Sequence, residues 1–424
     1  MNLMPTRADW QDARRAPLTD LIAGITVAIV ALPLALAFGI ASGLGAESGL
    51  TTAIIAGALA AIFGGSRLQV SGPTGAMTVV LVPIVHQFGI KGVLLVGLMA
   101  GIILVAAAFA KIGQHVHRLP TSLIEGFTAG IAVVITLQQF PFIFGVAASD
   151  SEKVWAGALD VIQRGFLDFN PEPIAIAILV GLVILAGSNK FARVPFALVT
   201  VIAAAAATQI FQLNVATIGS LPARIGNFDL SFTQSDNLFA LVPSAIAVAA
   251  LAALESLLSA KVADKMHGAD EKHDSNRELF GQGLANIVVP FFGGVPATAA
   301  LARTAVNVRS HAQSKLAAFS HSVILALVVI LFAPLVGMIP LSALAGVLLA
   351  TTARMIKPKE LLALAKETRL DDLVLICTFV ATIAIDLISA VIIGLLLSLA
   401  FRKTGLAKID RRYPPVDQKE TLGD

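Results

Sequence analysis

Long runs of apolar residues recur along the whole chain, and short charged or Gly/Pro-rich connections separate them. A helix of about 20 mainly apolar residues is long enough to cross a bilayer. The pattern therefore predicts an all-α integral membrane protein with about 14 transmembrane spans. The spans lie near residues 18–41, 47–64, 73–87, 92–112, 121–140, 173–187, 194–211, 239–262, 278–292, 297–310, 316–337, 341–356, 371–386 and 387–402.

The predicted spans divide into two sets of seven, and this division defines the domain organisation. Because seven is an odd number, the second set must cross the membrane in the opposite sense, as an inverted repeat. Residues 155–166 predict a separate amphipathic surface helix, because charged residues interrupt their apolar pattern. The predicted regions are a cytoplasmic N-terminus at 1–17, a first repeat at 18–211, an extracellular connection at 212–238, a second repeat at 239–403 and a cytoplasmic tail at 404–424.

Composition and charge support this topology. Of the 424 residues, 57% are hydrophobic and 13% are charged, whereas a soluble domain carries about a quarter charged residues. Lys91, Lys153, Arg164 and Arg224 fall on the outer side, Arg303 lies within a span, and the other Lys and Arg fall on the inner side, as the positive-inside rule requires. We expect a multi-pass protein of the cell (inner) membrane with both termini cytoplasmic, surrounded by lipid and without a nucleic-acid partner.

A short pattern recurs in both halves. Phe63-Gly64-Gly65 closes the second span and Phe292-Gly293-Gly294 closes the ninth, and each is followed by a broken Pro/Thr/Ala-rich segment, at 71–76 and 295–300. A chance match in a Gly-rich chain is the alternative explanation. Paired interrupted segments in corresponding positions indicate a binding site between discontinuous helices. Two helices that begin in mid-membrane would present unpaired N–H groups and positive dipole ends to an anion.

Two charged residues lie deep in apolar sequence, Glu255 in the eighth span and Arg303 in the tenth. Each costs about 2.5–3.5 kcal/mol at a helix centre, so it needs a structural or functional reason. The structural interpretation is an ion pair that ties two helices together. In the functional one, Arg303 attracts an anion, Glu255 takes up a proton, and Thr74 and Thr304 add hydroxyl donors. Asp386 is also set in an apolar run, and we place it at the outer boundary between two spans.

The sequence contains no recognisable catalytic or metal-binding pattern. Cys377 is the only cysteine, so no intrachain disulfide or cysteine metal site is possible. Phosphate-cradling, nucleophile-elbow and HExxH motifs are absent, which disfavours an enzyme or an ATP-driven pump and predicts no cofactor. The loop histidines have spacings unlike a metal site; they are His115, His117, His267, His273 and His311.

At these residues the chain resembles the sulfate-permease (SulP) family of anion transporters, the bacterial relatives of prestin and pendrin. The resemblance extends from Asp20 to about Phe401. Each stretch that carries it is weak alone, but their occurrence in this order is specific. The stretches lie at residues 31–39, 70–75, 276–286, and 303–307 followed by 314–317.

The resemblance implies a 7+7 inverted repeat of the uracil-transporter type, with half-helices at spans three and ten preceded by short extended segments. Spans one to four and eight to eleven would form a core domain, and spans five to seven and twelve to fourteen a gate domain. The family also implies a homodimer. Carried onto this chain, the proton-coupling residue would be Glu255, and the substrate-binding residues would be Phe38, Thr74, Gly75, Ala76, Ala300, Leu301, Ala302, Arg303 and Thr304.

The chain departs from the family pattern at several points. Leu34 stands where many members have Gln, and Ala302 replaces the Ser of a common Ser-Arg pair. Arg303 occupies the space that a sodium ion takes in sodium-coupled bicarbonate-type members, so we expect no sodium coupling. Family members usually continue into a cytoplasmic STAS domain, whereas this chain stops at Asp424. Either the chain is truncated, which is the expected explanation, or the member is naturally short; loss of the STAS domain would weaken the dimer.

These observations predict a secondary active transporter that moves a small anion by alternating access. The expected activity is proton-coupled symport of a small dicarboxylate of the fumarate or succinate kind. Transport or exchange of bicarbonate, sulfate or chloride stays open as well, because helix ends and one Arg recognise charge more than shape. Two further hypotheses are an anion channel of the same fold and a structural or sensing membrane protein without flux. Nucleobase transport is disfavoured, because Arg303 suits anions better than neutral rings.

Overall fold

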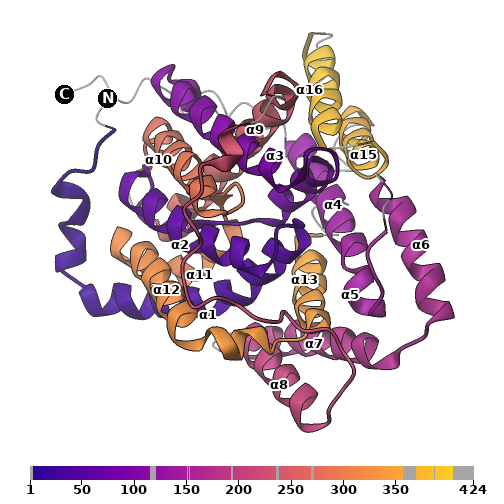
Figure 1. Cartoon of the computed structure of the whole chain (residues 1–424). Coiled ribbons are helices and arrows are strands. Elements are labelled where there is room, and N and C mark those ends of the chain that lie inside the picture. Colours follow the sequence, from indigo (N-terminus) through magenta and orange to yellow (C-terminus); the bar gives the residue numbers. More distant parts are fainter. Residues whose placement is uncertain are drawn as a thin grey trace, which may run out of the picture. The chain divides into compact units, whose positions relative to one another are not determined.

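The computed structural model describes residues 3–114, 121–149, 151, 153–191, 194–234, 238–268, 272–356, 369–385 and 387–403. Asp386, His115, His117 and the predicted tail at 404–424 lie outside these residues. Figure 1 shows the elements coloured along the chain. Those of the first half are α1 (Pro17–Ala41), α2 (Ala46–Phe63), β1 (Ser71–Gly72), α3 (Gly75–Phe109), α4 (Thr121–Gln138), α5 (Phe140–Phe144), α6 (Val154–Leu167), α7 (Pro171–Lys190) and α8 (Phe196–Ile210).

The second half repeats this order of elements. It contains α9 (Leu238–His267), α10 (Ser275–Val288), the short 3-10 helix η5 (Val289–Phe292), β2 (Thr298–Ala299), α11 (Leu301–Arg309), α12 (Lys315–Gly337), α13 (Leu341–Met355), α15 (Arg369–Ala384) and α16 (Leu387–Lys403). Each predicted span falls on a helical segment, and an extended segment precedes both α3 and α11. The predicted all-α inverted-repeat fold is therefore confirmed, half-helices included.

The boundaries of some spans differ from the prediction. Spans three and four form the single element α3, and only Gly89, with φ of +67°, breaks its helical course. A left-handed φ without a steric cost is the property that glycine supplies. Among the described residues, seven helices are long and apolar enough to cross a membrane. Shorter apolar helices accompany them at Phe196–Ile210, Leu341–Met355, Asp372–Ala384 and Ser389–Ser398.

The chain forms two compact units. One comprises Met1–His117 and Ala132–Arg354, and the other Arg118–Ile131 and Met355–Asp424. Within the smaller unit, Gly126 lets the start of α4 approach α15, because a Cβ atom at Gly126 would lie 2.4 Å from the carbonyl oxygen of Leu375. All residues of the predicted anion site belong to the larger unit.

Small residues bring helices of the larger unit into backbone contact. A Cβ atom at Gly49 of α2 would lie 2.0 Å from the Ala35 carbonyl oxygen of α1, and one at Gly101 of α3 would lie 2.7 Å from the Gly283 carbonyl oxygen of α10. Close backbone approach through Gly and Ala stabilises membrane helices by van der Waals contact. The abundance of these residues therefore serves the packing of α1 on α2 and of α3 on α10.

The segment before α1 is joined to the first turn of α10 and to the segment after α2, on the predicted cytoplasmic side. Arg277 donates two hydrogen bonds to the carboxylate of Asp9, at 2.7 and 2.8 Å, and Arg67 donates one to Asp12 at 2.9 Å. Burial would raise the pKa of Asp9, but the hydrogen bonds from Arg277 and Thr6 outweigh it and hold this pKa well below its usual range. The N-terminal segment thus ties the start of the first repeat to the second.

Candidate anion site

The two extended segments meet in an antiparallel pair. Ser71 of β1 lies opposite Ala299 of β2, and Gly72 lies opposite Thr298. The backbone N–H of Ala300 adds a hydrogen bond to the Val70 carbonyl oxygen at 2.9 Å. Because the strands run in opposite directions, α3 and α11 leave this crossing in opposite senses. Both helices therefore begin next to the same point, one from each repeat.

Each of these helices begins with backbone N–H groups that have no partner within the helix. Thr74 is the N-cap residue of α3, and its Oγ1 accepts the Met77 N–H at 3.4 Å. Ala300 is the N-cap residue of α11 and offers no side-chain cap. The first amides of both helices, together with the positive end of each helix dipole, can therefore bind an anion.

Glu255 projects from α9 to the start of α3. Its Oε2 accepts a hydrogen bond from Oγ1 of Thr74 at 2.9 Å, and the side chain is only partly buried. A carboxylate that touches a helix N-terminus changes the charge that an incoming anion meets. Protonation of Glu255 would therefore strengthen the site for anions, and deprotonation would weaken it.

Arg303 lies on the opposite side of the crossing, in the first turn of α11. Its side chain is 1% exposed, and its Nη2 donates to the Pro73 carbonyl oxygen at 2.7 Å. Its Nε and Nη1 have no hydrogen-bond partner in the part of the chain that the structure describes. Glu255 and Arg303 form no ion pair there, although the sequence had left this pairing open as a structural role. The guanidinium charge is therefore not cancelled by that carboxylate.

The other predicted site residues gather around the same crossing. The Phe38 ring of α1 is buried against the start of α3, with its Cε1 3.2 Å from where a Cβ atom of Gly75 would stand. Leu301 and Ala302 are exposed at the start of α11. Thr304 is buried instead, and its Oγ1 accepts the Val70 N–H and the Ser259 hydroxyl, both at 3.1 Å. Thr304 thus joins α11 to α9 and to the segment before β1.

Sequence reasoning missed a row of polar side chains on α10. Glu278, Gln282 and Asn286 stand four residues apart, so they lie on one face of this helix. Asn286 contacts the segment before β2: its Nδ2 donates to the Ala297 carbonyl oxygen at 2.9 Å, and its Oδ1 accepts the Ala297 N–H at 2.7 Å. The signal was present in the sequence, since buried polar residues at this spacing in a membrane span need partners.

The same α10 row holds the other extended segment. Gln282 donates from Nε2 to the hydroxyl oxygen of Ser71 in β1. Glu278 accepts the backbone N–H groups of Gly65 and Ser66 at 2.9 and 3.0 Å, directly after the end of α2. One helix therefore fixes the segments that lead into both α3 and α11.

We predict that Asn286→Ala destabilises the protein and lowers its transport activity together. The change leaves the buried N–H and C=O of Ala297 without partners, at a cost of about 1–3 kcal/mol for each group. A lower thermal unfolding temperature and a lower initial rate of anion uptake are expected. Gln163→Ala, which removes an exposed amide from α6, serves as the control. An unfolding temperature equal to that of the parent would contradict this role for Asn286.

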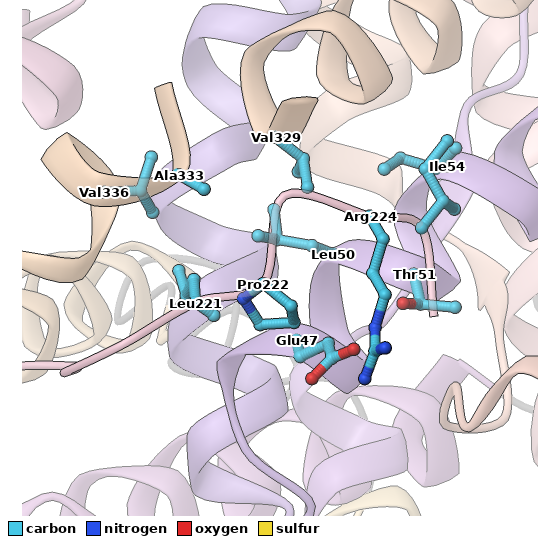
Figure 2. A pocket seen from close by; sticks show the side chains of 11 residues that line it. Glu47, Leu50, Thr51, Ile54, Leu221, Pro222, Arg224, Val329, Ala333 and Val336 are labelled. Atoms are coloured by element: carbon cyan, nitrogen blue, oxygen red, sulfur yellow. The ribbon is translucent and has the colours of Figure 1, made fainter. Parts of the chain in front are cut away.

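A crevice that encloses about 300 Å³ lies elsewhere in the same unit. It is lined by residues of α2 and of the end of α12, and by Leu221, Pro222, Arg224 and Ile225. Figure 2 shows its apolar walls, with the polar ends of Glu47 and Arg224 toward one edge. None of the predicted site residues lines this crevice. Its apolar walls lack the convergent donors that an anion needs, so we place the anion site at the strand crossing.

Comparison with known proteins agrees with this arrangement of elements. Residues 18–378 match the sulfate permease family. The chain belongs to the sulfate permease family. YvdB of Bacillus subtilis, classed by its name as a sulfate transporter, is 41% identical over 388 residues, which cover 90% of this chain and 73% of YvdB. The bicarbonate transporter BicA of Picosynechococcus is 30% identical over 393 residues, which cover 88% of this chain and 68% of BicA.

Solved structures of anion transporters share the fold. The transmembrane domain of a cyanobacterial BicA superposes with a TM-score of 0.81 at 31% identity, covering 89% of this chain and 97% of that domain. The murine anion transporter SLC26A9 in its inward-facing state gives a TM-score of 0.82 at 18% identity, covering 92% of this chain and 68% of that protein. The protein is thus a multi-pass member of a family of anion transporters.

Proposed function

We propose that the protein is a secondary active transporter that carries a small anion together with protons. The observation that carries this proposal is the meeting of two helix N-termini from opposite repeats beside a buried arginine. Both α3 and α11 begin at the β1–β2 crossing, and Arg303 has two N–H-bearing atoms without a partner among the described residues. Positive potential from three sources at one point favours an anion and disfavours a cation or a neutral ring.

The charge at this point favours a divalent anion. Each helix N-terminus is equivalent to roughly half a positive charge. Together with the guanidinium of Arg303 they amount to roughly two positive charges, which one divalent anion would neutralise. A small dicarboxylate of the fumarate kind is therefore our first candidate substrate, and sulfate, the substrate in the name of YvdB, is the second. Bicarbonate, the substrate in the name of BicA, and chloride carry a single charge.

Glu255 is the proposed proton carrier. An ionised Glu255 beside Thr74 subtracts one charge from the site, and its protonation restores that charge. The proton and the anion therefore favour each other's binding, which is the thermodynamic basis of symport. Sodium coupling is not part of the proposal, because the Arg303 side chain fills the space beside Gly72 and Pro73 with a fixed cation.

Transport would follow from alternating access of this site to the two sides of the membrane. We propose that the core formed by spans one to four and eight to eleven moves against the remaining spans, in an elevator-like or rocking motion. The extended segments and the α10 row belong to this core, so the site would travel with it. A homodimer is the proposed assembly.

The decisive test is uptake of labelled fumarate, sulfate and bicarbonate into proteoliposomes under an imposed inward proton gradient. We expect accumulation of at least one of them in the parent and a fall to the background level in Glu255→Gln, because the variant cannot bind the proton. Glu47→Gln removes a carboxyl from the apolar crevice shown in Figure 2 instead and is expected to behave like the parent. Accumulation that ignores pH and survives in Glu255→Gln would contradict proton coupling.

The same experiment distinguishes the two other classes of function. An anion channel would give a flux that follows the electrochemical gradient without a fixed number of protons per anion. A structural or sensing protein would give no flux at all, and Glu255→Gln would then change only the unfolding temperature. Neither rival predicts accumulation of an anion against its own gradient.

A further inference from the structure

A buried histidine on α12 has no role in the anion site at the strand crossing. His321 is 0% exposed, and neither of its ring nitrogens has a hydrogen-bond partner among the residues that the structure describes. A buried imidazole without a partner is costly, since each unsatisfied polar group loses its hydration. Its presence in the interior of a membrane span therefore calls for a function.

The position of His321 on α12 places it behind the anion site. Ala317 is one helical turn away on the same face and packs in a buried cluster with Ala23 of α1, Leu68 and Val308. Ala318, three residues away, packs in a second cluster with Val27 of α1, Ala61 of α2, Val70 and Val306. The imidazole thus lies where α12 meets α1, α2, α11 and the segment that leads into β1.

Arg303 stands one helical turn before Val306, which packs in the Ala318 cluster, whereas Arg309, the other charged residue of α11, is exposed at the end of that helix. The other ionisable side chains of the surrounding elements are engaged nearer the helix ends. Asp20 of α1 accepts from the backbone N–H of Gln313 at 2.7 Å, and Lys315 of α12 donates to the Gly64 carbonyl oxygen. The only ionisable residue in the sequence of α2 is Glu47, at its opposite end.

We propose that His321 is a second proton-binding residue of the transport cycle, coupled to the anion through Arg303. An anion held at the unpartnered atoms of Arg303 would offset the guanidinium charge on the turn of α11 next to this part of α12. A proton on the imidazole and an anion on the guanidinium therefore attract each other across a buried, water-poor interior. Because linkage is reciprocal, each of the two ligands raises the affinity for the other.

This inference rests on the proposed function and adds a second proton-binding residue to it. Glu255 approaches the anion from the start of α3, whereas His321 acts from behind α11. Two protonatable groups on the two sides of the site would let one divalent anion enter with two protons, which leaves the net charge of the loaded site unchanged. Transport of such an anion would then respond weakly to membrane voltage.

The test is a count of the protons that the protein takes up when it binds an anion. Purified protein in lipid nanodiscs is mixed with sulfate or with fumarate in weakly buffered solution, and a pH-sensitive dye reports proton uptake between pH 5.5 and 8. The parent is expected to take up protons with the anion, and His321→Gln about one proton fewer at the pH of maximal uptake. His311→Gln, which changes an exposed histidine just after α11, is expected to match the parent.

Anion-for-anion exchange in liposomes separates a proton-binding role from a packing role. His321→Gln is expected to retain exchange within about twofold and to lose at least about tenfold in proton-driven accumulation. Loss of both activities, in His321→Gln and in His321→Asn alike, would make His321 a packing residue and overturn the proposal. Unchanged proton uptake in His321→Gln would overturn it as well. A parent that binds and carries the anion without protons would instead overturn the proposed symport itself.

Discussion

Arg303→Gln is expected to lower the rate of anion uptake by about a thousandfold. At about 4 Å and the effective dielectric constant of a partly buried site, one charge pair contributes about 4 kcal/mol, which corresponds to a factor of about a thousand. The variant keeps the size and some hydrogen-bonding capacity of the side chain but loses its charge. The two helix ends remain, so residual binding of the anion at high concentration is expected.

The measurement is initial uptake at several anion concentrations, together with the unfolding temperature. Arg309→Gln is the matched control, because Arg309 is exposed at the end of the same helix α11. It is expected to transport within about twofold of the parent. Uptake by Arg303→Gln within tenfold of the parent would move the anion site away from the strand crossing. Arg224, which lines the crevice shown in Figure 2, would then be the cation to replace next.

Gly72→Ala is expected to abolish most transport while leaving the protein folded. A Cβ atom at Gly72 would lie 2.2 Å from Nη1 of Arg303, whereas the Cα atom of Ala53 is 3.4 Å away. The clash is with the far end of a flexible side chain, so the guanidinium moves, and the φ of +159° at Gly72 adds some backbone strain for any residue with a Cβ atom. This movement breaks the hydrogen bond to Pro73 and displaces the charge from the site. We expect at least a hundredfold loss of uptake and a shift in the unfolding temperature of only a few degrees.

Gly181→Ala provides the comparison for this variant. Gly181 is buried in α7, and a Cβ atom there meets only the Gly346 carbonyl oxygen, at an ordinary contact distance of 3.4 Å. This substitution is expected to change neither uptake nor stability by a measurable amount. If Gly72→Ala transports like Gly181→Ala, the position of the guanidinium does not matter to the anion, and Arg303 acts only through its long-range field.

The membrane-spanning fold could be predicted from sequence because charges are rare in the apolar runs, and the same rarity singled out the charged residues of the candidate site. Glu255 and Arg303 stand out for this reason, and the Phe-Gly-Gly repeats precede the extended segments that lead into α3 and α11. The partners of these charges could not be predicted. Thr74 lies 181 positions from Glu255, and Pro73 lies 230 positions from Arg303, so only the folded chain brings each pair together.

The roles of the uncharged polar residues of α10 also could not be predicted from the sequence. Gln282 and Asn286 stand in a glycine-containing stretch whose low apolar content resembles a loop as much as a span. Their role depends on the carbonyl and amide groups that the two extended segments expose, and sequence periodicity carries no information about those groups. His321 was missed for a related reason: a single histidine in an apolar run has no spacing pattern to identify it.

The attachment of both extended segments to α10 has a consequence for the direction of transport. Since one helix fixes the starts of α3 and α11 together, the spacing between the two sets of amide donors would not change during the proposed turn of the site from one side of the membrane to the other. An anion that arrives from outside and one that arrives from inside therefore meet the same donors in the same geometry. Under the proposed mechanism the binding site by itself would not rectify the flux, and the ion gradients alone would decide its direction.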